Sequence, residues 1–111
     1  PGGRADEASV RSALQAAFAL AEQNGCRSVA VPALGAGIGG LSLQRCAEIC
    51  LEEARRQLAE PGSQLAEIRF VLYGEPAYRL FEMVDDAARV AARRPPGQAR
   101  WKAIRFRSAS R

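Results

Sequence analysis

Residues 28–41 read Ser-Val-Ala-Val-Pro-Ala-Leu-Gly-Ala-Gly-Ile-Gly-Gly-Leu, and this stretch decides the fold. Its first part, 28–31, is an almost uninterrupted apolar run, which predicts a strand buried on both faces, as in a parallel sheet. Four glycines follow within residues 35–40, and Ser42 is a good N-cap for a helix. The stretch therefore predicts a strand, a glycine-rich loop and a helix, in that order.

The segments on either side continue the alternation of helices and strands. Apolar residues recur at three- and four-residue spacing over 6–24 and again over 42–59, which predicts two helices. Residues 67–73 (EIRFVLY) alternate like a strand, with Ile68, Phe70 and Leu72 on one face. A third helix begins near Pro76 and ends before the prolines at 95 and 96.

The order helix-strand-helix-strand-helix indicates an α/β layered fold. Two strands are too few for a sheet that is covered by helices, so we expect this chain to be a fragment or to need a partner. Residues 93–111 hold seven of the 16 basic residues and no acid, whereas 1–92 carry nine basic and twelve acidic residues. We therefore divide the chain into a body, 1–92, and a basic, flexible tail, 93–111.

The glycine-rich loop is the candidate site for chemistry. Glycines let consecutive backbone N–H groups converge on an anion, and the following helix adds its positive N-terminal end. The letters GAGIGG also satisfy the dinucleotide-binding pattern G-x-G-x-x-G, so a Rossmann domain is the rival interpretation. Against it, residues 32–34 separate the strand from the loop, and Glu60 lies beside a Pro-Gly break rather than at the end of the next strand.

The string Pro-Ala-Leu-Gly-Ala-Gly-Ile-Gly-Gly at 32–40 resembles the second phosphate-binding loop of macro domains. The resemblance covers about residues 8–85 and places the chain in the C-terminal half of such a domain. It implies a partial three-layer α/β/α fold and a site for ADP-ribose, with the first half of the domain supplying the adenine-reading and distal-ribose groups.

Carried over by position, the resemblance implies that the loop wraps the diphosphate of ADP-ribose through its backbone amides and that Tyr73 covers the adenine. The expected ligand-binding residues are Ala33, Leu34, Gly35, Ala36, Gly37, Ile38, Gly39, Gly40 and Tyr73. Gly39 stands where many members have Tyr or Phe beside the distal ribose. A core role for the Tyr73 ring is the alternative.

Two activities follow from the resemblance. The first is binding of ADP-ribose or of ADP-ribosylated protein, and the alternative is an ADP-ribosyl hydrolase or O-acetyl-ADP-ribose deacetylase in the complete domain. The chain has no histidine, and no catalytic residue, metal site or cofactor is predicted. Cys26, Cys46 and Cys50 have no CxxC spacing, so we interpret them as reduced core thiols of a cytoplasmic protein.

A third hypothesis is that the basic tail makes weak contact with nucleic acid. Trp101 and Phe106 lie among basic residues there, a composition that suits single strands through charge and stacking. Residues 101–106 could form a short strand, but the surrounding basic residues make it a poor core element. No apolar run is long enough for a membrane span. Because the sequence predicts only two strands, we expect the isolated chain to aggregate or to unfold without cooperativity.

Overall fold

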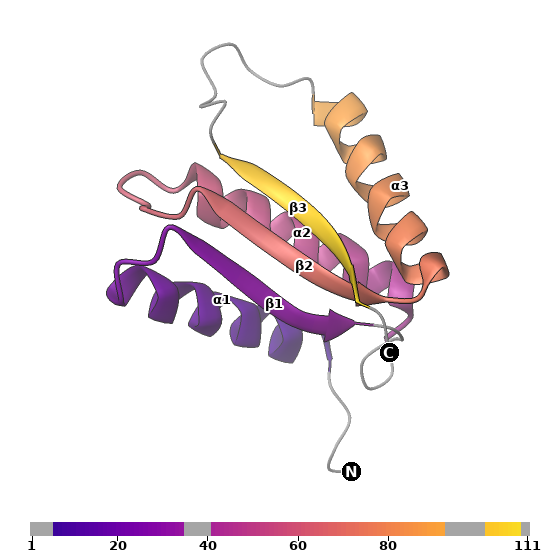
Figure 1. Cartoon of the computed structure of the whole chain (residues 1–111), viewed down its shortest axis with the longest axis horizontal. Helices are drawn as coiled ribbons and strands as arrows, with labels where there is room; N and C mark the ends of the chain where they lie inside the picture. Colours follow the sequence, from indigo (N-terminus) through magenta and orange to yellow (C-terminus); the bar gives the residue numbers. More distant parts are fainter. Residues whose placement is uncertain (1–5, 35–40, 93–101, 110–111) are drawn as a thin grey trace.

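The computed structural model describes residues 6–34, 41–92 and 102–109. In chain order the elements are α1 (Glu7–Gln23), β1 (Ser28–Leu34), α2 (Leu43–Ala59), β2 (Glu67–Tyr73), α3 (Glu75–Ala92) and β3 (Ala103–Ala109). The predicted alternation of three helices with the first two strands is confirmed, and the fold is α/β (Figure 1).

The helices begin and end at the capping and terminating residues that the sequence contains. Asp6 caps α1, its carboxylate accepting a hydrogen bond from the Ser9 N–H at 2.8 Å, and Gly25 follows the helix with a φ of 68°. Ser42 caps α2, as predicted, and its hydroxyl accepts from the Arg45 N–H at 3.0 Å. These caps satisfy N–H groups that the first turn of a helix leaves without a backbone partner.

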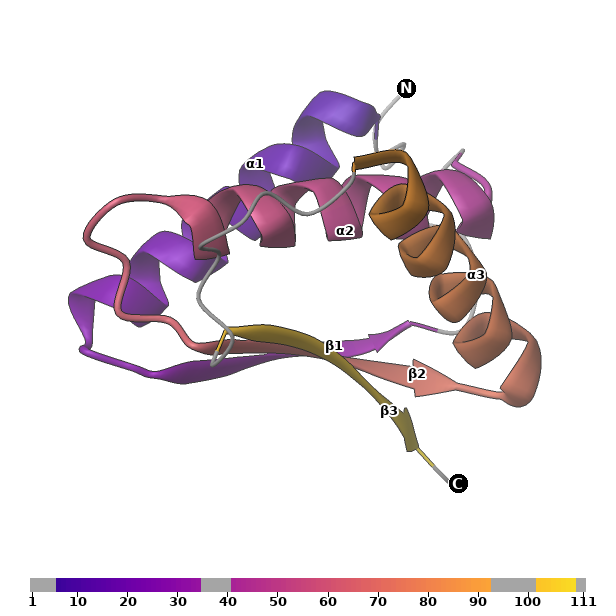
Figure 2. The same cartoon turned by 90° about the horizontal axis from the view of Figure 1, so that it is seen from above.

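The strands form one parallel sheet in the order β1-β2-β3. All three helices lie on one face of it, with α2 between α1 and α3 (Figure 2). The described residues thus supply the sheet and one helical layer of the predicted three-layer arrangement. Their core lies between these layers and includes Phe18, Ile49, Leu51, Leu65, Ile68, Phe70, Leu72 and Phe81.

In the described residues the strands are buried on one face, whereas the apolar run of β1 predicted burial on both faces. Val31 points into the core, whereas Ala30 and Pro32 are exposed. On β2, Ile68, Phe70 and Leu72 are fully buried as predicted, while the alternate positions are half-buried or exposed.

The third strand corrects the view of residues 93–111 as a flexible tail. Ala103–Ala109 pairs in parallel with β2 over all seven of its residues, from Glu67↔Ala103 to Tyr73↔Ala109. Ile104 and Phe106 turn toward the core, and the Phe106 ring lies 5.9 Å from that of Phe81. The basic residues did not prevent a strand because alternation directs them to the opposite, open face. Residues 93–101 and 110–111 lie outside the described residues.

Candidate functional site

The candidate site lies at the edge of the sheet where the parallel strands end. Carboxyl ends of parallel strands share one edge, and ligands of open α/β sheets bind there. β1 ends at Leu34 and β2 at Tyr73, and α2 begins nearby at Leu43 (Figure 1). Of the nine predicted site residues, Ala33 and Leu34 belong to β1 and Tyr73 to β2. The six loop residues 35–40 lie outside the described residues.

The strand register brings the two predicted parts of the site together. Leu34 pairs with Leu72, after an irregularity in the register between Val31 and Leu34. Tyr73 is the next residue of β2, so it stands beside the point where the glycine segment leaves β1. Tyr73 is 37% exposed.

Gly74 follows Tyr73 directly and was not singled out from the sequence. Its φ is 83°, a conformation that favours glycine, and it turns the chain from β2 into α3. The Tyr78 N–H donates to the Gly74 carbonyl at 3.3 Å, so the turn is part of the first turn of α3. A glycine immediately after a strand was the signal that could have identified this residue.

The N-terminal end of α2 has the electrostatics of an anion site. The first turn of this helix contains no acidic residue, so no side chain there offsets the positive end of the helix dipole. Arg45 in that turn is engaged elsewhere, since its guanidinium pairs with Glu7 and with Glu48. The hydrogen bonds that Arg45 donates to the carboxylates of Glu7 and Glu48 raise the pKa of Arg45, which therefore stays charged.

The cysteine thiols do not contribute to this edge. Cys46 and Cys50 are buried on the inner face of α2, and Cys26 is half-buried, all three as free thiols. Burial, together with the neighbouring Cys46, raises the pKa of Cys50 to about 12. Cys50 is therefore protonated at neutral pH and is not an activated nucleophile, in agreement with the prediction of core thiols.

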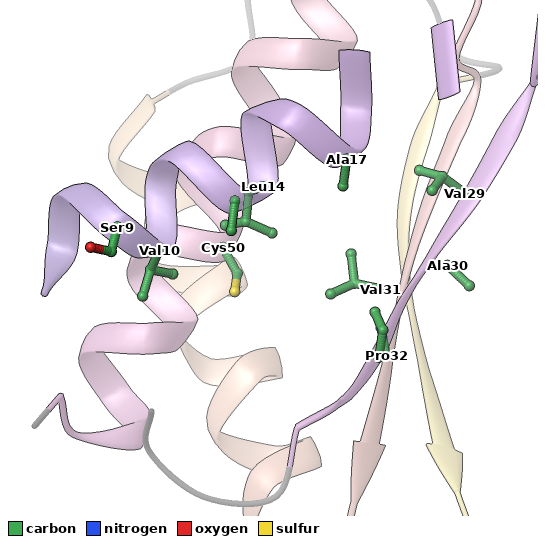
Figure 3. Close-up of a pocket in the computed structure, with 10 residues that line it drawn as sticks. Ser9, Val10, Leu14, Ala17, Val29, Ala30, Val31, Pro32 and Cys50 are labelled. Carbon is green, nitrogen blue, oxygen red and sulfur yellow. The ribbon is translucent and has the colours of Figure 1, made fainter. Parts of the chain in front are cut away.

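A separate cavity of about 340 Å³ lies between α1 and β1 (Figure 3). Its lining is apolar and includes Val10, Leu14, Ala17, Val29, Val31 and Cys50. A diphosphate needs N–H donors or cations, so this cavity does not suit ADP-ribose. Among the described residues no group of three or more His, Cys, Asp or Glu side chains could hold a metal ion.

Comparison with known proteins agrees with this geometry. The family model for the macro domain matches residues 1–50, which contain α1, β1 and the glycine-rich segment. A macro domain-containing protein of Streptomyces griseus is 36% identical over 83 residues. The chain is similar to the macro domain family over these residues. At the level of the family, this similarity supports ADP-ribose binding, and it specifies neither the loop nor a hydrolytic activity.

Other relatives of this chain are uncharacterized proteins. An uncharacterized protein of Aeropyrum pernix is 42% identical over 82 residues, and one of Mycobacterium tuberculosis is 34% identical over 93 residues. The matches cover 74–84% of the chain but only 42% of the Aeropyrum protein, 25% of the mycobacterial protein and 45% of the Streptomyces protein. The chain thus spans between a quarter and less than half of these relatives. No solved structure matches it significantly.

None of the described helices is both long and apolar enough to cross a membrane. The cytoplasmic location inferred from the cysteines stays a prediction, as does contact with nucleic acid through residues 93–111.

Proposed function

We propose that residues 33–40 form the diphosphate-binding side of an ADP-ribose site and that Tyr73 contributes its adenine-binding wall. The observation that carries this proposal is the register Leu34↔Leu72, which puts Tyr73 beside the start of the glycine segment. The uncompensated N-terminal end of α2 supports it, because a helix N-terminus attracts phosphate. In this proposal the backbone amides of 35–40 are the principal donors, and the first half of the macro domain supplies the remaining contacts.

Binding is the function that the described residues support, rather than hydrolysis or deacetylation. The buried acids, Glu53 and Asp85, are paired with arginines inside the helical layer and do not reach the strand-end edge. The Cys46 and Cys50 thiols are enclosed in the core. A hydrolytic activity of the complete domain would therefore need groups from beyond these residues or a water positioned by the substrate itself.

The substitution Gly37→Glu tests the loop. It adds bulk and a negative charge where the diphosphate must sit, so we expect ADP-ribose binding by the complete macro domain to be lost. Isothermal titration calorimetry measures this directly. Ser12→Glu is the matched control, because it adds the same charge at an exposed position of α1, and it should leave the affinity unchanged.

The same titrations distinguish a macro domain site from a Rossmann site. We expect ADP-ribose to bind much more tightly than NAD. Unchanged affinity in Gly37→Glu would remove the loop from the proposal, and a preference for NAD would favour the dinucleotide-binding alternative.

A further inference from the structure

The turn between α1 and β1 contains the dipeptide Asn24-Gly25, and Asn24 is the only asparagine of the chain. Both residues are exposed. An asparagine can react with its own backbone when the nitrogen of the next residue attacks the side-chain amide carbon and closes a five-membered imide. Glycine favours this attack because it has no Cβ to obstruct its nitrogen. The dipeptide therefore holds an electrophile and its nucleophile in adjacent residues.

The fold keeps both reacting groups in hydrogen bonds. Asn24 is the C-cap of α1, and its side-chain amide donates to the Leu20 carbonyl at 2.8 Å. The Gly25 N–H must lose its proton before its nitrogen can attack, and it donates to the Glu22 carbonyl at 3.0 Å. Both acceptors are carbonyls of the last turn, which lack partners within the helix. The cap of α1 thus protects the dipeptide.

The backbone torsion of Asn24 also opposes the reaction. Ring closure needs the Gly25 nitrogen on the same side of the Asn24 Cα–C bond as the Asn24 side chain. The ψ of Asn24 is 7°, so the Gly25 nitrogen lies beside the backbone nitrogen of Asn24 instead. Rotation about this bond is required before the reaction, and it breaks the hydrogen bond to Glu22.

Glu22 fastens this end of α1 to the segment that precedes β2. Its carboxylate accepts from the Gln64 N–H at 2.9 Å, from the Gln57 amide at 2.7 Å and from the Ser63 hydroxyl. Opening of the last helical turn disturbs these contacts. The contacts of Glu22 therefore oppose the opening that the reaction needs.

We propose that Asn24 is a site of spontaneous deamidation and that opening of the α1 C-cap sets its rate. In the open turn the Gly25 nitrogen bonds to the Asn24 Cγ, the Cγ–Nδ2 bond breaks, and ammonia leaves with the proton that the Gly25 nitrogen gives up. Water then adds to either carbonyl of the imide and opens the ring. The product at position 24 is aspartate or isoaspartate, and water is the only co-reactant.

The product destabilises the turn in which it forms. The new carboxylate lacks the N–H donor that Asn24 offers to the Leu20 carbonyl, and it puts a negative charge at the negative end of the helix dipole. Isoaspartate also lengthens the backbone by a methylene group. Because the change is not reversed, the modified fraction grows with the time that the turn spends open. This inference does not depend on ADP-ribose binding.

Ageing of the whole 111-residue chain in mildly alkaline buffer, followed by peptide mapping with isoaspartate detection, tests the proposal. The reaction at Asn24 should be at least about 10-fold slower in the native chain than in concentrated urea, because only open turns react. Gly25→Ala should slow the reaction in urea, since its Cβ obstructs the nitrogen. Absence of isoaspartate at position 24 in urea would overturn the site, and equal rates in buffer and urea would overturn its protection by the cap.

Glu22→Ala tests whether the contacts of α1 control the opening. It keeps the reactive dipeptide but removes the carboxylate that holds this end of the helix. The native rate should rise about 5-fold, the equivalent of one net hydrogen bond, while the rate in urea stays the same.

The matched control is Glu82→Ala, which removes the same charge from an exposed position of α3 and should leave both rates unchanged. An equal increase in the two variants would show that charge or global stability sets the rate. No increase in Glu22→Ala would show that this turn is not the controlling element. Either result would contradict the proposal.

Discussion

Among the described residues Glu53 is one of two buried acidic side chains, and it joins α2 to α1. Its carboxylate, 1% exposed, accepts from the Arg11 guanidinium at 2.9 Å and from the Gln15 amide at 3.1 Å. Burial by itself raises the pKa of Glu53. The hydrogen bonds from Gln15 and Arg11, with the charges of Arg56 and Arg11, outweigh burial and leave the pKa below its ordinary value.

The substitution Glu53→Gln should lower the free energy of unfolding at pH 7 by about 1–3 kcal/mol, since it removes a charged acceptor from a buried network. A lowered folded-state pKa stabilises the fold above the ordinary value of 4.5, and this contribution disappears as the pH falls through the folded-state value. The difference between the two proteins should therefore shrink below about pH 4.5. Urea unfolding across this range measures it.

Glu52→Gln is the control for Glu53→Gln. Glu52 pairs with the same arginine at 2.9 Å, but its side chain is 50% exposed. Surface pairs contribute little, so the expected loss is below about 1 kcal/mol. Equal losses in the two variants would contradict the view that burial makes Glu53 important.

Tyr73 is the described side chain on which the proposed adenine contact depends. Tyr73→Ala should weaken ADP-ribose binding by about 1–3 kcal/mol, the range found for base–aromatic stacking, and Tyr73→Phe should cost little because it keeps the ring. Calorimetry and thermal unfolding are measured together. Intact affinity with a large loss of stability would instead show that the ring serves the core.

At the scale of elements, β3 makes part of the basic segment 93–111 a strand of the sheet. Phe106 is the residue that attaches this strand to the helical layer, with its ring edge-on to Tyr78 and to Phe81. Lys102 reinforces the entry to the strand, because its ammonium donates to the Leu58 carbonyl at 2.8 Å. The side chains of Ile104 and Phe106 and the parallel pairing with β2 therefore hold this strand in place.

Phe106→Ala should lower the free energy of unfolding by about 2–3 kcal/mol, somewhat less than for a fully buried phenylalanine, because Phe106 is half-buried. The neighbouring Arg107→Ala should change it by less than about 0.5 kcal/mol, since Arg107 is exposed. Chemical denaturation measures both. If Phe106→Ala is as mild as Arg107→Ala, residues 103–109 behave as the flexible tail that the sequence suggested.

At the scale of the whole molecule, the sheet has an open edge at β1. In the described residues β1 pairs only with β2, and its outer edge borders the apolar cavity beside α1. Ala30 projects away from α1 at this strand and is exposed (Figure 3). Long, uncharged edge strands promote association through their unpaired N–H and C=O groups.

We therefore expect the chain to associate as its concentration rises, and Ala30→Lys to reduce this association, because a charge on an edge strand opposes pairing. Size-exclusion chromatography with light scattering measures the mass. Ala19→Lys adds the same charge at an exposed position of α1 and should leave association unchanged. A chain that stays monomeric at every concentration would contradict this interpretation of the β1 edge.

The expected instability of the isolated chain rested partly on a count of two strands. The third strand adds a hydrogen-bonding neighbour to β2 and covers part of the aromatic core. Of the two features expected to destabilise the chain, only the open edge of β1 is present in the described residues.

The sequence by itself determined the helices, the first two strands and the segment proposed to bind ligand. Asp6, Ser42 and Gly25 act on neighbouring residues, so their effects are visible in a few letters of sequence. The similarity to macro domains was likewise indicated by the short string at 32–40, and the comparisons confirmed it.

Only the tertiary structure decided that residues 103–109 form a strand and that all three helices share one face. Pairing of Phe106 with Phe70 joins residues far apart in the chain, and the free energy comes from burial that no local pattern reports. The register that brings Tyr73 beside the end of β1, and Arg69 beside Arg105, has the same origin. Packing between distant segments determines which strands pair and in which register. Helix caps and helical periodicity depend on residues that are close together in the sequence.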